Sequence, residues 1–153
     1  MHLTGIGQRI LLTLWVGGLW TAGYIVAPML FHVLDDRRLA GQIAGELFTV
    51  ISYIGLVCGV LLLISVLYQA GQHWRRTWQA WALVAMLVLI GIGEFVLQPM
   101  THVLKDATPQ GFIEGSAEAA RFGMLHGVAS ILFLMTSLLG LALVVFGLNR
   151  DNA

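Results

Sequence analysis

Four long apolar stretches alternate with short polar segments along this chain. We predict membrane-spanning helices at about residues 9–34, 46–69, 78–100 and 122–148. Each stretch is long enough to cross about 30 Å of hydrocarbon at a rise of about 1.5 Å per residue. The pattern therefore predicts one all-α domain over residues 1–153, an integral membrane four-helix bundle with antiparallel up-down topology.

The first apolar stretch is too long for a cleaved signal peptide. The apolar region of such a peptide has about 7–15 residues and is followed by small residues at a cleavage site. Here the apolar run continues from Arg9 past Trp15, Trp20 and Tyr24. We therefore interpret it as a retained membrane helix.

Composition supports a membrane protein and excludes some partners. Of the 153 residues, 58% are hydrophobic and only 10% are charged, whereas a soluble domain has about 25% charged residues. The eight Lys and Arg residues balance the eight Asp and Glu residues, so no basic excess points to a nucleic acid. The expected partner is the lipid bilayer. A single cysteine, Cys58, excludes a disulfide framework and a thiol pair for metal.

Polar side chains gather at one face of the predicted bundle. The first and third helices would end, and the second and fourth would begin, at that face. The polar side chains expected there are Glu94, Gln98, His126, Glu46, Arg121, His32 and His102. A carboxylate in hydrocarbon costs about 3 kcal/mol, so it is expected to face other helices and to have a partner. Glu94 and His126 would lie at similar depth, about 6–9 Å below the interface, and could contact each other.

Each of these residues also has a structural interpretation. Glu94 could be protonated or hydrogen-bonded to the fourth helix, and His126 could donate to a backbone carbonyl. His32 and His102 fall at the interface, where histidine is common. Glu46 could begin its helix, where a carboxylate suits the helix dipole. Arg121 could extend to the lipid headgroups.

The sequence requires no cofactor but leaves a metal ion or a haem open. Met100 and Met124, together with Met29, fall near the same face, and thioethers suit Cu(I). The metal-ligand candidates are therefore His126, Glu94, Met100 and Met124. A haem would take His32, His102 or His126 as axial ligands.

The buried acid favours a non-enzymatic binding or transport module for a metal ion or a proton. Two alternatives stay open: a haem-linked or redox membrane protein, and a structural partner of another membrane protein or of a second copy. Gly55 and Gly59, four residues apart, would form a packing face for such assembly. We recognise no nucleophile with its base, no phosphate loop and no zinc-protease histidine pair, so the sequence lends little support to hydrolytic chemistry. Whether the protein is an enzyme stays open, and a non-enzymatic role is favoured.

Several short motifs resemble the transmembrane protein 205-like family. They are Arg121-Phe122, His126-Gly127 and Ser130, Glu94 with Pro99, Leu47-Phe48 after Gly45, and Gly18 with Trp20. The resemblance implies a four-helix integral membrane protein of a group otherwise labelled a domain of unknown function. It supplies no agreed activity, although a eukaryotic relative is linked to tolerance of platinum drugs, which fits metal handling or export.

The basic residues do not orient the chain by number, because they divide equally between the two sides. Arg75 and Arg76 lie in a very short connector and Arg9 precedes the first helix. Short basic loops stay in the cytoplasm. We therefore expect a bacterial inner-membrane protein with both termini in the cytoplasm.

Overall fold

The computed structural model describes residues 2–108, 111–113 and 115–148, and within these residues it contains helices and no strand. Four helical segments are long and apolar enough to cross a membrane: Gly5–Val33, Arg37–His73, Trp78–Ala107 and Ala117–Phe146. The predicted all-α class with four spans is confirmed.

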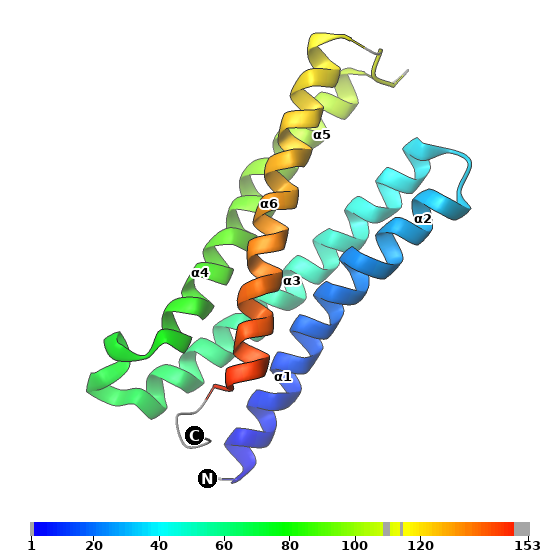
Figure 1. Cartoon of the computed structure of the whole chain (residues 1–153). Coiled ribbons are helices and arrows are strands. Elements are labelled where there is room, and N and C mark those ends of the chain that lie inside the picture. Colours follow the sequence, from blue (N-terminus) through cyan, green and yellow to red (C-terminus); the bar gives the residue numbers. More distant parts are fainter. Residues whose placement is uncertain (1, 109–110, 114, 149–153) are drawn as a thin grey trace.

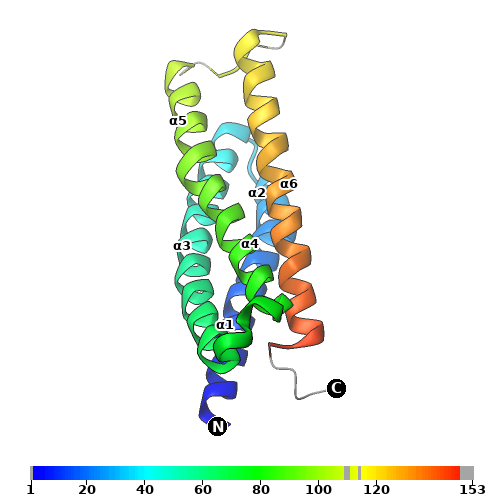
Figure 2. The same cartoon turned by 90° about the vertical axis from the view of Figure 1, so that its left-hand side faces the viewer.

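The helices form two hairpins. The first hairpin consists of α1 (His2–Trp20), the π-helical turn η1 (Thr21–Val26), α2 (Ala27–Val33) and α3 (Arg37–Ala70). A short 3-10 helix, η2 (Gly71–Arg76), leads to the second hairpin of α4 (Trp78–Ile92), the π-helical turn η3 (Gly93–Leu97), α5 (Gln98–Ala107) and α6 (Ala117–Phe146). Figure 1 shows α1 leading away from the N-terminus to α2, and α3 returning toward the end where α4 starts. Figure 2, turned by 90°, shows α4 and α5 leading away again and α6 returning.

The second span begins earlier than its apolar stretch predicts. The Asp36 side chain accepts hydrogen bonds from the backbone N–H groups of Arg38, at 2.8 Å, and Leu39, at 3.2 Å. This N-cap starts α3 at Arg37, since it satisfies N–H groups that have no partner inside the helix. Glu46 therefore lies inside α3, and the interpretation that it begins the helix is wrong.

In each hairpin, the first membrane span contains one π-helical turn shortly before a proline. η1 precedes Pro28, and η3 precedes Pro99. A proline has no N–H to donate and its ring crowds the carbonyl four residues earlier, and a wider turn relieves that crowding. The third span therefore does not end at residue 100. It passes the proline and continues through α5 to Ala107.

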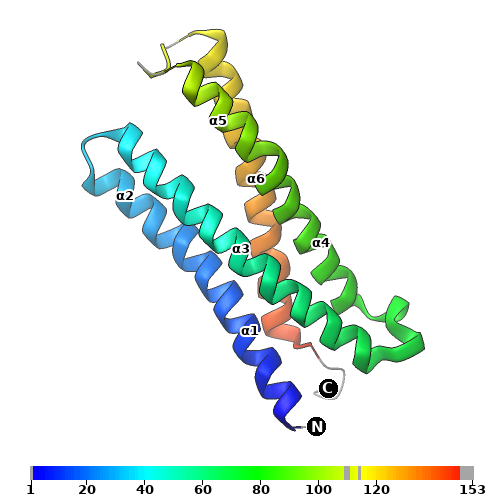
Figure 3. The ribbon, with the colours of Figure 1, turned by 180° about the vertical axis from the view of Figure 1, so that it is seen from behind.

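The buried core lies in the half of the bundle that contains the termini. The largest fully buried side chains are Trp15, Leu62, Leu83, Met86, Leu143 and Ser137. The two hairpins contact each other through α3 with α4 and through α1 with α6, whereas α2 packs on α3 and α5 packs on α6. Figure 3 shows the consequence: the end of the first hairpin at α2 stands apart from α5 and the start of α6.

The two hairpins are copies of one pattern. When the sequence is aligned with itself at an offset of 71 positions (79 minus 8), the buried residues of α1 align with those of α4. The pairs are Gln8 and Gln79, Leu12 and Leu83, Trp15 and Met86, and Leu19 and Ile90. The same shift pairs Pro28-Met29 with Pro99-Met100, and one residue fewer pairs His32-Val33-Leu34 with His102-Val103-Leu104.

A shift of 81 positions (140 minus 59) relates α3 to α6. It pairs Ala44 with Leu125, Gly55 with Thr136, Gly59 with Gly140 and Leu62 with Leu143, and all eight are buried. The contacts repeat as well. A Cβ at Gly59 would meet Leu87 and Trp15, and a Cβ at Gly140 would meet Val16 and Met86, which are the residues that the first shift pairs with them. The buried positions and their contacts therefore repeat between the hairpins, as in an internal duplication.

Candidate functional site

Glu94 continues the buried face of α4 into the half of the bundle where the hairpins separate. Leu83, Met86 and Ile90 are buried at helical spacing, and Glu94 follows Ile90 by four residues on the same face. Its side chain is half-buried and makes no hydrogen bond or ion pair with any residue that the structure describes. A span of about 20 residues crosses the hydrocarbon, so one that starts at Trp78 ends near Leu97. By this measure we expect the carboxyl group inside the membrane.

The helix that carries Glu94 is held against α3 by two contacts. Gln98 Nε2 donates to Thr49 Oγ1 at 3.0 Å. The rings of Phe95 and Tyr53 meet edge to face with centroids 6.5 Å apart. Since Gln98 meets Thr49 and Phe95 meets Tyr53, Glu94 falls near the level of Tyr53 and Ile54. We call the boundary of α3 with η3 and α5 the polar interface.

A pocket of about 310 Å³ opens on the polar interface, on the loop side of Glu94. Its lining combines both charges with neutral polar groups: Gln42, Gly45, Glu46, Gln98, His102, Lys105 and Asp106. Gln98 thus belongs to both the pocket and the hydrogen bond with Thr49. From Gln98 to Glu94 is one helical turn, about 6 Å along the axis. The polar groups thus extend from the loop side to within about one turn of the carboxyl group.

The symmetry-related boundary, between η1 and α6, is aromatic. Phe133 of α6 covers Gly23, where a Cβ would collide with the phenyl ring. The same ring lies 5.5 Å from Tyr24 and 5.5 Å from Phe48, centroid to centroid. We call this boundary the aromatic interface. The two copies of the hairpin boundary therefore differ in chemistry.

The structure divides the seven predicted site residues into two groups. Glu46, Gln98 and His102 meet in the pocket, and Glu94 lies below it. His126 and Arg121 lie exposed on α6, and His32 lies exposed on α2.

The structure gives no contact between Glu94 and His126. His126 stacks on Phe122, with ring centroids 6.1 Å apart, and Phe122 stacks on Phe112. Lys105 lies 6.0 Å from the centroid of the Phe122 ring. The contact between the carboxyl group and this imidazole stays a prediction.

The candidate metal ligands do not form a cluster in the described part of the chain. There, no group of three or more His, Cys, Asp or Glu side chains is placed to hold a metal ion. Met100 and Met124 are 52% and 65% exposed. His32, His102 and His126, the candidate haem ligands, lie on three different helices, α2, α5 and α6. A haem stays a prediction.

The glycine face of α3 is occupied by the chain itself. Trp15 lies against Gly55 and Gly59, and both glycines are buried. The spacing predicted a packing face correctly, but its partner is α1 of the same hairpin, with Leu87 of α4 also meeting Gly59. Assembly with another membrane protein or a second copy stays a prediction that needs a different surface.

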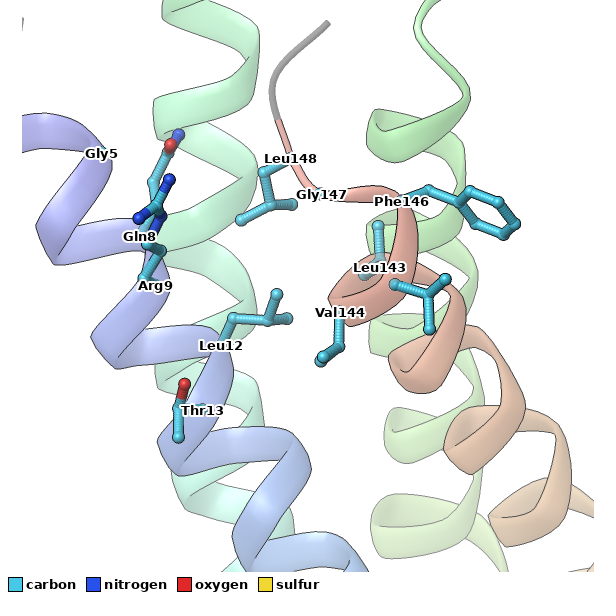
Figure 4. Close-up of a pocket in the computed structure, with 11 residues that line it drawn as sticks. Gly5, Gln8, Arg9, Leu12, Thr13, Leu143, Val144, Phe146, Gly147 and Leu148 are labelled. Atoms are coloured by element: carbon cyan, nitrogen blue, oxygen red, sulfur yellow. The ribbon is translucent and has the colours of Figure 1, made fainter. Parts of the chain in front are cut away.

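A second pocket lies at the opposite end of the bundle. It has a volume of about 380 Å³ and lies between the beginning of α1 and the end of α6 (Figure 4). Gln8, Arg9 and Thr13 line it from α1, and Leu143 and Val144 line it from α6. Because Leu12, Trp15 and Leu143 belong to the buried core, the core separates this pocket from the polar interface.

Sequence reasoning missed the polar residues of α3 at the polar interface: Thr49, which accepts the hydrogen bond from Gln98, and Ser52, three residues later on the same helix face. Thr49 and Ser52 lie inside a long apolar run and carry no charge, so nothing in the run distinguishes them. The signal that could have found them is the duplication. The segments PMLFHVLDD and PMTHVLKD mark equivalent positions in the two hairpins, and any pair of equivalent positions with different chemistry is then a candidate.

These features define a helical membrane protein made of two similar hairpins, with a carboxyl group at one of their two boundaries. The chain belongs to the family described as a domain of unknown function, DUF4149, which matches residues 10–110. The matched region includes Thr49, Glu94, Gln98 and His102, whereas α6 lies beyond it. No curated protein and no solved structure matches the chain.

Proposed function

We propose that the protein is a small transport module that moves protons, with Glu94 as the group that takes up and releases the proton. The observation that carries the proposal is that Glu94 follows the buried Ile90 by four residues and is half-buried without a hydrogen-bond partner in the described chain. Intramembrane carboxyl groups are costly and commonly mark proton or ion pathways. A carboxyl group needed only for packing would be expected to have a partner.

The polar interface supports a route to this carboxyl group. The pocket holds Glu46 and His102 on the loop side, and Gln98 and Thr49 follow one turn above Glu94. A proton needs a single carboxyl group as its carrier, whereas a bound metal ion takes several donor groups. The described residues provide such a carboxyl group in Glu94, but they contain no group of three or more His, Cys, Asp or Glu side chains that could hold a metal ion. A proton is therefore better supported than a metal ion as the transported species.

The duplication also fits transport. Some transporters consist of parallel repeats related by an axis along the membrane normal, with the site at the boundary between repeats. Glu94 lies at such a boundary. The resemblance to the transmembrane protein 205-like family, with a relative linked to tolerance of platinum drugs, is compatible with export coupled to protons.

Proton flux in proteoliposomes tests the proposal. The protein is reconstituted with a pH-sensitive dye inside the vesicles, and a potassium gradient with valinomycin drives proton entry. Wild-type protein is expected to acidify the lumen, and Glu94→Gln is expected to abolish the flux because the amide cannot carry a proton. Glu118→Gln is the matched control, since Glu118 is exposed in the first turn of α6.

The result that contradicts the proposal is wild-type flux in Glu94→Gln, or no flux above empty vesicles in the wild type. His126→Ala tests the predicted partner: loss of flux there would bring the imidazole into the pathway. Thermal unfolding of each variant in detergent shows whether a loss of flux comes from a loss of fold.

The proposal places the protein in a bacterial inner membrane with both termini in the cytoplasm. The exposed Arg75 and Arg76 of η2 support this orientation. A reporter fused to the C-terminus that is active only in the periplasm should stay inactive; activity would reverse the orientation.

A further inference from the structure

The two boundaries between the hairpins are equivalent by symmetry but not by chemistry. The offset of 71 positions aligns Gly23 with Glu94, and the offset of 81 positions aligns Ser52 with Phe133. In the aromatic interface a large ring thus faces a glycine. At the equivalent positions of the polar interface, the chain has the hydroxyl group of Ser52 and the carboxyl group of Glu94.

The contacts of the polar interface support this pairing without the symmetry. Gln98 bonds to Thr49, and Phe95 meets Tyr53, so Glu94 falls near the level of Tyr53 and Ile54, less than about one turn from Ser52. Ser52 follows Thr49 by three residues and shares its helix face. Its hydroxyl group, like the carboxyl group, has no hydrogen-bond partner among the described residues, and Ser52 is only half-buried.

The aromatic interface is filled by packed rings. Phe133 covers Gly23 and contacts the rings of Tyr24 and Phe48. One turn below, Ser137 is 1% exposed. The ring cluster thus lies between the loop side and the buried core.

Resting on the proposed function, we propose that only the polar interface conducts. Water and protons reach Glu94 from the loop side past Gln98 and Thr49, with Ser52 as a positioning residue across from the carboxyl group. Phe133 seals the equivalent path in the other interface. The seal directs the flux through the boundary that carries the acid.

Labelling with a charged thiol reagent tests this without measuring flux. Single cysteines replace Ser52 and Ser137 in full-length protein in which Cys58→Ala removes the native thiol. A quaternary-ammonium methanethiosulfonate is applied from the loop side. It reacts with the thiolate, which forms in water and not in apolar surroundings. We expect Ser52→Cys to react at least about tenfold faster than Ser137→Cys, and Ser137→Cys to become reactive when Phe133→Ala removes the seal.

Placing an aromatic ring in the polar interface and measuring proton flux tests the same inference. Ser52→Phe places in the polar interface the ring that Phe133 places in the aromatic one, and we expect flux to fall to the level of Glu94→Gln. Val50→Phe is the matched control, because Val50 is on the same helix and 55% exposed; it should keep wild-type flux. If Ser52→Phe does not fold, as judged by thermal unfolding, the labelling of Ser52→Cys decides.

The outcomes separate this inference from the proposed function. Flux that requires Glu94, together with an unreactive cysteine at position 52 or full flux in Ser52→Phe, overturns the conducting role of the polar interface and leaves the proposed function standing. A Ser137→Cys that stays unreactive after Phe133→Ala overturns the seal. A reactive cysteine at position 52 without any wild-type flux supports the water path and refutes proton transport.

Discussion

Replacing Gly59 with alanine is expected to loosen the packing of α3 against α1 and α4. The added Cβ would lie 2.7 Å from Leu87 Cδ2 and 2.8 Å from Trp15 Cη2. The leucine methyl group can rotate away, but the edge of a fully buried indole ring cannot move without shifting α1. The close approach of α3 to both α1 and α4 thus depends on this glycine.

The size of the effect follows from two opposing terms. Overpacking a well-packed core costs about 1–3 kcal/mol, while exchanging glycine for alanine inside a helix gains at most about 1 kcal/mol. Gly17→Ala is the matched control, because a Cβ at Gly17 meets no atom within 4 Å. This variant should gain the helix stability of alanine without the cost of overpacking. We therefore expect the two variants to differ by about 1–3 kcal/mol in free energy of unfolding. Gly140→Ala should lie between them, since its closest contact is 3.0 Å, to Val16 Cγ2.

Thermal unfolding in detergent, followed by size-exclusion chromatography of the surviving fraction, measures this order. At about 2–4 °C per kcal/mol for a chain of this size, the midpoints of Gly59→Ala and Gly17→Ala should differ by several degrees. Equal midpoints would refute the reasoning, because they would mean that Trp15 and Leu87 do not approach the α3 backbone as closely as the structure has them.

Two further predictions concern single contacts. Asp36→Ala should cost about 1 kcal/mol through loss of the N-cap and lower the unfolding midpoint, with Asp35→Ala as the neighbouring control; equal effects of both variants would argue against the cap. A double-mutant cycle of Thr49→Val and Gln98→Leu should give a coupling of about 0.6 kcal/mol, the average for hydrogen bonds between membrane helices, and additive effects would show that the bond contributes no stability.

The number and class of the helices were readable from the sequence, because apolar length alone defines a span. The helix ends were less readable. Asp36 looks like part of a charged turn, and only its hydrogen bonds show that it starts α3. Pro99 looks like a stop, but a proline in the first turn of α5 loses no hydrogen bond that the helix needs.

The candidate site was readable only in its charged members. Glu94 stands out because hydrocarbon penalises a carboxylate, and Glu46 and His102 because they are polar at a helix end. Which of these residues meet depends on how the hairpins are rotated against each other. That rotation is set by close contacts between the hairpins, such as Leu87 against Gly59 and Val16 against Gly140, and no pattern of polar positions predicts it.

The duplication bears on whether Glu94 is required by the fold. In the core, Trp15 lies against Gly55 in one hairpin, whereas the smaller Met86 and the larger Thr136 hold the equivalent positions in the other. From the first hairpin to the second, the residue on the first helix becomes smaller (Trp15 to Met86) and the residue on the second helix becomes larger (Gly55 to Thr136). The total side-chain volume at this position is therefore similar in the two hairpins.

The same kind of exchange occurs at the level of Glu94, but there it also brings in a carboxyl group. The equivalent place is filled by Gly23 and Phe133, with no polar side chain. The fold therefore fills this position with apolar groups in one of its two copies. Because a carboxylate in hydrocarbon costs about 3 kcal/mol and packing at this position does not demand one, the acid is better explained by what it binds than by what it supports.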